Sequence, residues 1–232
     1  MPTDKATDAK KAHAGYRICV TRNGPYLVSG GLPLSRQIIV SDANGDPLLW
    51  RAGETYATGE TYALCRCGHS KKWPFCDGKH ALIRFDGTET AGRAPYLDAA
   101  EVTEGPDLRL TDVRILCANA GFCTRAGGTR NLTERSADPR ARRTAIEQAG
   151  NCPSGRLVAW AKDGPAIEPE LEPSIGVTEN PLTGARGSIW VRGRIPIEAA
   201  DGTVYEVRNR VTLCGCGKSS NKPFCDGCHS EK

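Results

Sequence analysis

Short alternations of hydrophobic and polar residues, broken by glycine and proline, run along much of the chain. Residues 37–40 and 203–207 alternate as half-buried strands do, and the pairs Asn44-Gly45 and Asp201-Gly202 beside them are turn signals. Gly and Pro together number 41, from 26 Gly and 15 Pro, and only 6% of residues are aromatic. This pattern predicts a loop-rich, mainly β or α+β protein rather than a thick helical core.

One segment carries helix signals instead. Asp138 is a suitable N-cap, Pro139 suits the first helical position, residues 141–149 form the body and Gly150 is the stop. Residues 163–186 are rich in Pro, Gly and Glu and are interpreted as a connecting loop. We therefore expect one clear helix between two β-rich parts.

The β pattern occurs twice. The sequence GPYLVSGGLPL at 24–34 aligns with GSIWVRGRIPI at 187–197, glycine for glycine at both ends of a strand and proline for proline after it. The first copy has 41 residues from Gly24 to Cys65, whereas the second has 27 from Gly187 to Cys214, and the difference is interpreted as a loop insertion.

A second similarity follows each of these strands. CRCGHSKKWPFCDGKH at 65–80 and CGCGKSSNKPFCDGCH at 214–229 are identical at ten of sixteen positions. In an extended chain Cys65 and Cys67 face the same side, and Cys76 and His80, four apart, share a face if a helical turn forms there. The segment therefore offers two pairs of metal ligands. The second copy repeats them as Cys214, Cys216, Cys225 and His229.

Two kinds of metal site suit such ligands. Three cysteines and one histidine can hold a single tetrahedral zinc, which would make the segments structural interaction modules. Zinc sites commonly place two to four residues between the members of a pair, whereas a single residue separates Cys65 from Cys67. A two-iron cluster fits this spacing better, with one iron held by the close cysteine pair and the other by the cysteine and the histidine.

The pattern C-x-C-x2-S-x3-P-x-C-D-G-x-H resembles the signature of the CDGSH iron–sulfur proteins, and both copies match it at every fixed position. The resemblance covers about 15–90 and 184–230. It implies a 2Fe–2S cluster in each copy, eight ligands in all, used for electron transfer, redox sensing or cluster transfer. The implied ligands are Cys65, Cys67, Cys76 and His80, and Cys214, Cys216, Cys225 and His229. Because imidazole replaces one thiolate, the site is less negative and its potential should exceed that of plant-type ferredoxins.

Known members of this family are intertwined homodimers with one motif per chain. The resemblance therefore implies that the two halves of this chain pair as a pseudo-twofold internal dimer, with the two cluster sites side by side and the protein a monomer. An ordinary dimer with unrelated copies is the alternative. The penultimate signature position is Lys79 in one copy and Cys228 in the other, and Cys228 is a candidate for oxidation or for competing ligation.

The region between the copies has its own cysteines. Cys117 and Cys123, followed by Cys152-Pro153, resemble a divergent single-cluster ferredoxin, whose ligand run ends in a Cys-Pro pair. Only three cysteines occur where a cubane cluster normally takes four, and Cys19 is the other candidate besides Cys228. Two interpretations stay open, a third cluster or a ferredoxin-like remnant with buried apolar thiols.

The net charge, the hydrophobic pattern and the number of cysteines argue against several classes of protein. The net charge is only +4, which is far from the clustered basicity of a nucleic-acid binder. No run of about 18 apolar residues predicts a membrane span. Eleven cysteines, an odd number, without an export signal favour a reducing cytoplasmic location.

The resulting organisation is a flexible tail at 1–14 with His13 as a bystander, CDGSH-type domains at 15–90 and 184–232, and a ferredoxin-like middle segment with linker at 91–183. No catalytic residue pattern stands out, so we expect a non-enzymatic carrier whose partner is a redox protein or an apo-protein that accepts clusters. An electron-donating subunit of an oxidoreductase is the other functional reading.

Overall fold

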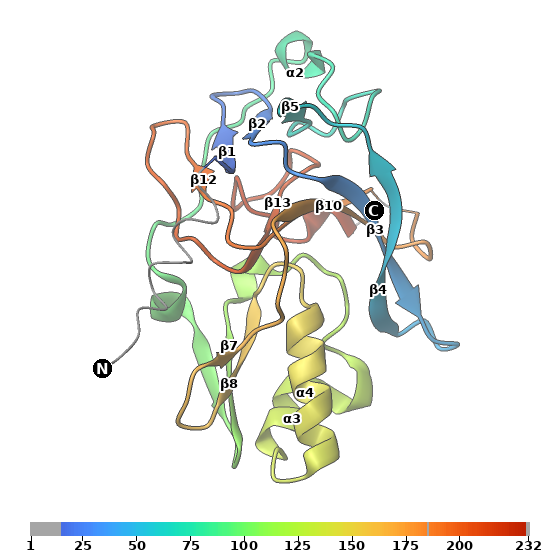
Figure 1. Cartoon of the computed structure of the whole chain (residues 1–232), viewed down its shortest axis with the longest axis vertical. Coiled ribbons are helices and arrows are strands. Elements are labelled where there is room, and N and C mark those ends of the chain that lie inside the picture. Colours follow the sequence, from blue (N-terminus) through green and yellow to red (C-terminus); the bar gives the residue numbers. More distant parts are fainter. Residues whose placement is uncertain (1–14, 185, 231–232) are drawn as a thin grey trace.

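The computed structural model describes residues 15–184 and 186–230, so the tail predicted at 1–14, with His13, lies outside the described residues. Three sheets and a few short helices make up this part of the chain (Figure 1). Two of the sheets form one body, and the third sheet packs beside the longest helix in a second body (Figure 1). The predicted mainly β, α+β class is confirmed.

Each half of the repeat contributes a set of short strands and ends in a helical turn. The first half contains β1 (Arg17–Val20), β2 (Tyr26–Ser29), β3 (Leu34–Ser41), β4 (Pro47–Tyr56), β5 (Thr61–Leu64) and α2 (Lys79–Leu82). The second contains β10 (Ser174–Glu179), β11 (Arg186–Arg192), β12 (Ile197–Glu198), β13 (Arg210–Leu213) and the 3-10 turn η4 (Cys228–Ser230).

The two halves exchange strands, since β12 joins the sheet of the first half and β3, with its hairpin partner β4, joins the sheet of the second. The sheet built on the first half has the order β12-β1-β2-β5, and the sheet built on the second has the order β13-β11-β10-β3-β4. β12 runs parallel to β1, with Ile197 opposite Ile18, and β3 runs parallel to β10, with Leu34 opposite Ile175. This reciprocal pairing confirms the predicted pseudo-twofold arrangement within a single chain.

One hydrophobic core lies between these two sheets and draws on both halves. Ile18, Tyr26 and Leu34 from the first half and Ile175 and Ile189 from the second are completely buried in it. Because burial alternates along β1 and β2, one face of each strand meets this shared core. The core therefore exists only when both halves are present.

Three local expectations are wrong. The extra residues of the first copy form the β3–β4 hairpin rather than a loop, with Asn44 and Gly45 in its turn. The segment 163–186 includes β9 (Ala166–Ile167) and the core strand β10, so it is not simply a connection. Residues 203–207 form no strand, and Val204 makes only an isolated bridge to Glu198. For β10, pairing with β11 and with the distant β3 overrode the local composition.

The middle region has its own small core. Its elements are η1 (Tyr96–Ala99), β6 (Glu101–Glu104), β7 (Leu108–Asp112), η2 (Arg114–Leu116), η3 (Arg125–Gly127), α3 (Thr129–Glu134), α4 (Pro139–Asn151), β8 (Leu157–Ala161) and β9. The predicted helix is confirmed, and the Asp138 side chain caps it by accepting from the Arg140 N–H. Ala141, Ala145 and Ala149 bury its inner face.

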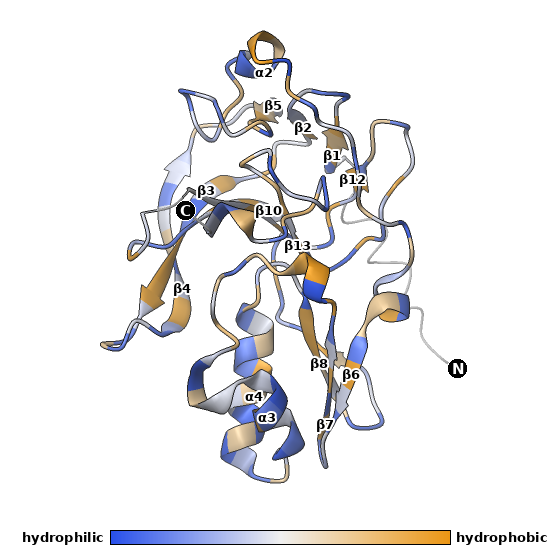
Figure 2. Cartoon of the chain, turned by 180° about the vertical axis from the view of Figure 1, so that it is seen from behind, coloured by the Kyte–Doolittle hydropathy of each residue, from blue (hydrophilic) through white to orange (hydrophobic). Residues whose placement is uncertain are grey.

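The strands and helices of the middle region differ in hydropathy. Figure 2 shows a contrast between the hydrophobic β8 and the largely hydrophilic helices α3 and α4. The buried alanines of α4 lie in clusters with Leu108, Leu110 and Leu157 from the neighbouring strands. None of the helices in the described part of the chain has the length and apolar character that a membrane crossing needs.

Candidate metal centres

The first motif begins where β5 ends and folds back beside it. The Cys65 N–H donates to the Pro74 carbonyl (2.8 Å), and the Cys76 N–H donates to the Ala63 carbonyl (2.9 Å). The Ser70 hydroxyl donates to the Phe75 carbonyl (2.6 Å). These bonds explain why serine and proline recur at fixed spacing, because the loop between them brings the second ligand pair beside the first.

The second motif has the same local structure after β13. The Cys214 N–H donates to the Pro223 carbonyl (2.8 Å), the Cys225 N–H to the Thr212 carbonyl (2.9 Å) and the Ser219 hydroxyl to the Phe224 carbonyl (2.7 Å). Equal bonds at equivalent positions show that the shared sequence encodes one local fold.

In both motifs the predicted ligands lie in two close pairs. The Sγ atoms of Cys65 and Cys67 are 3.9 Å apart, and Cys76 Sγ is 3.3 Å from His80 Nδ1. A tetrahedral metal with bonds of about 2.3 Å needs donors about 3.8 Å apart, so each pair is spaced to share one metal ion. The donor set thus fits a cluster in which each of two irons takes one pair.

The second motif repeats this pairing. Cys214 Sγ and Cys216 Sγ are 3.6 Å apart, and Cys225 Sγ is 3.4 Å from His229 Nδ1. Within residues 15–184 and 186–230, no three or more Cys, His, Asp or Glu side chains lie close enough together to hold a single metal ion.

An aspartate fixes the loop around each Cys-His pair. Asp77 accepts hydrogen bonds from the N–H groups of Lys71 (2.9 Å) and Lys79 (3.1 Å), and these bonds hold its pKa below the ordinary value. Asp226 likewise accepts from the Ser220 N–H (2.7 Å). These bonds explain why an aspartate follows the third cysteine in both motifs.

Two of the three ligand thiols of the second motif, Cys214 and Cys225, are buried. Burial raises the pKa of the Cys225 thiol to about 12, and a hydrogen bond with Cys216 together with burial raises the pKa of Cys214 well above its ordinary value. Burial also lowers the pKa of His229, so its imidazole is held neutral. Buried thiols become thiolates only beside a compensating cation, which a bound metal ion supplies.

The two sites differ in their exposure. Cys225 is 2% exposed and Gly227 is buried, whereas Cys76 is half-buried and Gly78 is exposed. The segment that covers the second site comes from the middle region, since a Cβ atom on Gly227 would lie 2.7 Å from the Cys117 carbonyl oxygen. The Cys-His pair of the first motif is therefore the more exposed of the two, and that of the second faces the middle region, whereas in the close cysteine pairs Cys67 is buried and Cys216 only half-buried.

Two glycines that the sequence analysis did not single out join the motifs. A Cβ atom on Gly68 would lie 2.6 Å from the Cys216 carbonyl oxygen, and one on Gly217 would lie 2.8 Å from the Cys67 carbonyl oxygen. The signal for them was present, because a glycine follows the second cysteine in both copies. The Tyr26 hydroxyl adds a further link by hydrogen bonding to the Cys214 carbonyl (3.0 Å).

The structure places the other candidate residues as follows. Cys228 Sγ lies 3.8 Å from Cys216 Sγ, so it is close to the second site, and Lys79 begins α2 beside the first. Cys19 lies in β1, away from both motifs, where its pKa is raised by burial and by Glu198. Cys117, Cys123 and Cys152 together line one pocket in the middle region.

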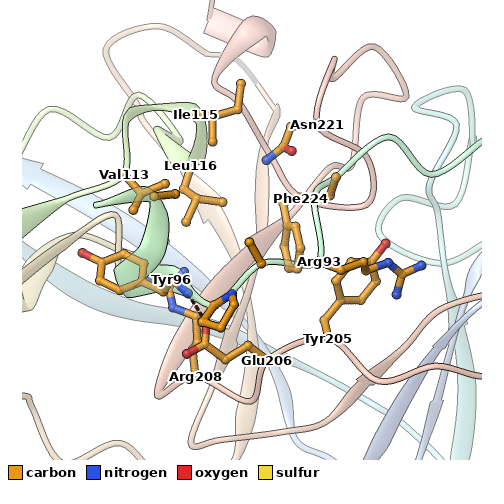
Figure 3. Close-up of a pocket in the computed structure, with 15 residues that line it drawn as sticks. Arg93, Tyr96, Val113, Ile115, Leu116, Tyr205, Glu206, Arg208, Asn221 and Phe224 are labelled. Atoms are coloured by element: carbon orange, nitrogen blue, oxygen red, sulfur yellow. Dashed lines mark hydrogen bonds between the residues drawn. The ribbon is translucent and has the colours of Figure 1, made fainter. Parts of the chain in front are cut away.

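A separate pocket of about 150 Å³ lies between the middle region and the second half (Figure 3). Arg208 lies over the Tyr96 ring at 4.2 Å, and Glu206 accepts a hydrogen bond from the Tyr96 N–H (2.6 Å). Phe224, the neighbour of Cys225, packs against Tyr205 with ring centroids 5.0 Å apart. The pocket is thus part of the joint that holds the second motif to the middle region.

Comparison with known families agrees with this geometry. Residues 23–81 and 186–230 match the family described as "Iron-binding zinc finger CDGSH type", and residues 103–162 match "Divergent 4Fe-4S mono-cluster". Neither the search of curated proteins nor the search of solved structures returned a significant match. Two CDGSH-type segments thus flank a divergent 4Fe-4S segment, which supports an iron–sulfur protein.

Proposed function

We propose that this chain, which carries two CDGSH-type iron-binding segments around a divergent 4Fe-4S segment, binds one 2Fe–2S cluster in each CDGSH-type site and acts in electron transfer, redox sensing or cluster transfer. The ligands of the first cluster are Cys65, Cys67, Cys76 and His80. Those of the second are Cys214, Cys216, Cys225 and His229.

One observation carries this proposal. The four donors of each motif lie in two pairs, at 3.9 and 3.3 Å in the first motif and at 3.6 and 3.4 Å in the second, and the same backbone bonds build both. Paired donors suit two metal ions rather than one. A bound cluster supplies reversible one-electron chemistry, while the protein positions the ligands and sets how much solvent reaches them.

The different exposure of the two sites suggests different roles for them. The Cys76–His80 pair is more exposed than the Cys225–His229 pair at its cysteine and at the glycine that follows, so the first site is the one we propose to meet a redox protein or an apo-protein acceptor. We also propose a non-enzymatic carrier that works as a monomer in a reducing, cytoplasmic setting, without nucleic-acid or membrane partners. The odd number of cysteines, eleven, supports the reducing setting, because they cannot all pair in disulfides.

The test is a count of metal and sulfide per chain, together with a visible absorption spectrum, on protein made under iron-replete, oxygen-free conditions. We expect iron with acid-labile sulfide, and we expect Cys76→Ser and Cys225→Ser each to remove about two irons. The matched control is Cys19→Ser, which should keep the full iron content. Colourless protein with about one zinc per motif would instead establish the zinc-stabilised module.

A turnover assay distinguishes the carrier from an electron-donating subunit of an oxidoreductase. If the protein is a carrier, a reductant will reduce its clusters, and they will be reoxidised only by an added acceptor. Sustained turnover when the purified chain is combined with a physiological reductase would instead support the electron-donating subunit of an oxidoreductase.

A further inference from the structure

The pocket between the middle region and the second half has apolar walls on two sides. Val113, Ile115 and Leu116 of the middle region line one side, and Phe224 of the second motif lines the other (Figure 3). Its volume is about 150 Å³, and an apolar cavity of about this volume in another protein accepts a benzene molecule. Ile115 is exposed, so the pocket is open to solvent on that side. The pocket therefore has room for one benzene-sized ring.

Asn221 places a carboxamide without a partner in this pocket. Figure 3 shows its side chain between Ile115 and Phe224, facing the pocket, and only 7% of the residue is exposed. Its backbone N–H donates to the Ser219 hydroxyl (3.0 Å), but its side chain makes no hydrogen bond with any residue that the structure describes. Because buried polar groups are costly without a hydrogen-bond partner, a ligand with a hydroxyl group would stabilise this carboxamide.

The first motif shows that the motif itself does not require this arrangement. The residue equivalent to Asn221 is Lys72, which is exposed. The residue equivalent to Phe224 is Phe75, which packs against Tyr62 with ring centroids 6.2 Å apart. The buried carboxamide therefore distinguishes the second motif from the first.

Arg208 supplies a positive charge on the side of the pocket opposite Asn221 (Figure 3). Its guanidinium lies over the Tyr96 ring and donates to the Gly155 carbonyl, and it forms no ion pair within residues 15–184 and 186–230. Burial lowers the pKa of Arg208, as expected where no carboxylate compensates the charge. A ligand carboxylate would supply this missing partner through two parallel hydrogen bonds.

The other charged side chains that line the pocket already have partners. Arg93 forms an ion pair with Asp201 (3.5 Å), and the Glu206 carboxylate accepts the hydrogen bond from the Tyr96 N–H (2.6 Å). The unpaired charge among the described lining residues is therefore positive, which favours an anionic ligand.

We infer that this pocket binds a small aromatic carboxylate with a hydroxyl group on the opposite side of its ring. The ring lies between Leu116 and Phe224, the carboxylate pairs with Arg208 and the hydroxyl group bonds to Asn221. Because this ligand contacts both the second motif and the middle region, it holds the two together and slows the opening of the second site. Only this effect on the second site rests on the proposed function.

Titration calorimetry of the full chain with para-hydroxybenzoate tests the binding. We expect a dissociation constant below about 1 mM, which is modest for a ligand of this size. Benzoate, which lacks the hydroxyl group, and para-hydroxybenzyl alcohol, which lacks the charge, should each bind at least about tenfold more weakly, because each loses one polar interaction. No binding of para-hydroxybenzoate at about 1 mM, or equal affinities for the three compounds, would overturn the inference.

Asn221→Leu keeps the size of the side chain and removes its carboxamide. It should weaken the binding of para-hydroxybenzoate about tenfold and leave that of benzoate unchanged. Lys72→Leu, at the equivalent position of the first motif, is the matched control and should bind both compounds as the parent does. Arg208→Gln should weaken the binding of both carboxylates, and Asn221→Leu still decides if that variant does not fold. Unchanged affinities in Asn221→Leu would contradict the assignment.

The effect on the second site is measured with Cys76→Ser, which keeps only that site. Para-hydroxybenzoate at about ten times its dissociation constant should slow the removal of iron by a chelator about tenfold, because opening first requires release of the ligand. Cys225→Ser, which keeps only the first site, should show no change. Binding with unchanged rates would refute the coupling to the second site. If neither variant holds iron, the proposed function fails, whereas the calorimetric titration still decides whether the ligand binds.

Discussion

Gly68 is packed against the backbone of Cys216, since a Cβ atom on Gly68 would lie 2.6 Å from the Cys216 carbonyl oxygen. The reciprocal contact joins Gly217 to the Cys67 carbonyl oxygen at 2.8 Å. Both glycines have positive φ values, 77° and 76°. Two motifs that are far apart in sequence are thereby held together through one pair of backbone contacts.

Gly68→Ala should therefore weaken both sites at once. The added methyl group meets backbone that cannot rotate away, and the positive φ disfavours alanine, so we expect a loss of more than about 1 kcal/mol in unfolding free energy. We also expect faster loss of iron from both motifs to a chelator. Gly92→Ala is the control, because a Cβ there meets nothing within 4 Å. Iron loss confined to the first motif would show that the motifs are not coupled here.

The unequal burial of the two sites gives a second prediction. Chelator should remove iron from the second site about tenfold more slowly than from the first, because Cys225 and Gly227 must first be uncovered by local opening that costs about 1.4 kcal/mol. The measurement compares Cys76→Ser, which keeps the second site, with Cys225→Ser, which keeps the first. Equal rates would mean that the middle region gives no protection.

The ligand pairs could be predicted from sequence because their chemistry is local. The spacing of Cys76 and His80 fixes the distance between their side chains once one helical turn forms. The same spacing occurs again in the second motif, which strengthened the prediction. The helix at 139–151 was predictable for the same reason, since Asp138 and Pro139 mark its start. Short-range geometry of this kind needs no knowledge of the rest of the fold.

What the sequence pattern missed depends on contacts between distant segments. β10 lies in a stretch whose composition resembles a loop, yet its residues are buried between β11 and β3. The β3–β4 hairpin was misread because its outer strand is largely exposed and carries no clear apolar face. The cover over Gly227 depends on packing between the middle region and the second half, which no local pattern encodes.

The exchanged strands predict a monomer with a shared core. We expect a single species near 24.9 kDa by light scattering. Leu34→Ala should lower the unfolding free energy by about 2–5 kcal/mol, because this completely buried side chain of the first half packs in the core of both. Leu49→Ala is the control, since that side chain is 49% exposed and should cost under about 0.5 kcal/mol. A dimer in which Leu34→Ala changes the association state would instead place the exchange between two chains.

Asp112 joins two arginines of the middle region, Arg130 and Arg156. Its carboxylate, 2% exposed, accepts from Arg156 and from Arg130 (2.8 Å), and although burial opposes ionisation, these bonds hold its pKa below the ordinary value. Asp112→Asn leaves both guanidinium groups without their charge partner, so we expect a loss of about 3 kcal/mol in unfolding free energy. Arg130→Gln should cost less, because Arg130 is more exposed than Arg156 and shares Glu101 as a second partner.

The pH dependence of that loss follows from the sign of the shift. A carboxyl group with a depressed folded pKa stabilises the protein above its unfolded pKa, about 3.9, and the contribution disappears as the pH falls through the folded value. The deficit of Asp112→Asn should therefore be constant from about pH 8 to about pH 5 and shrink only below about pH 4. Urea unfolding of parent and variant at several pH values measures it. A deficit that already shrinks between about pH 7 and about pH 5 would show that Asp112 is protonated in the folded protein, which the two arginine bonds do not allow.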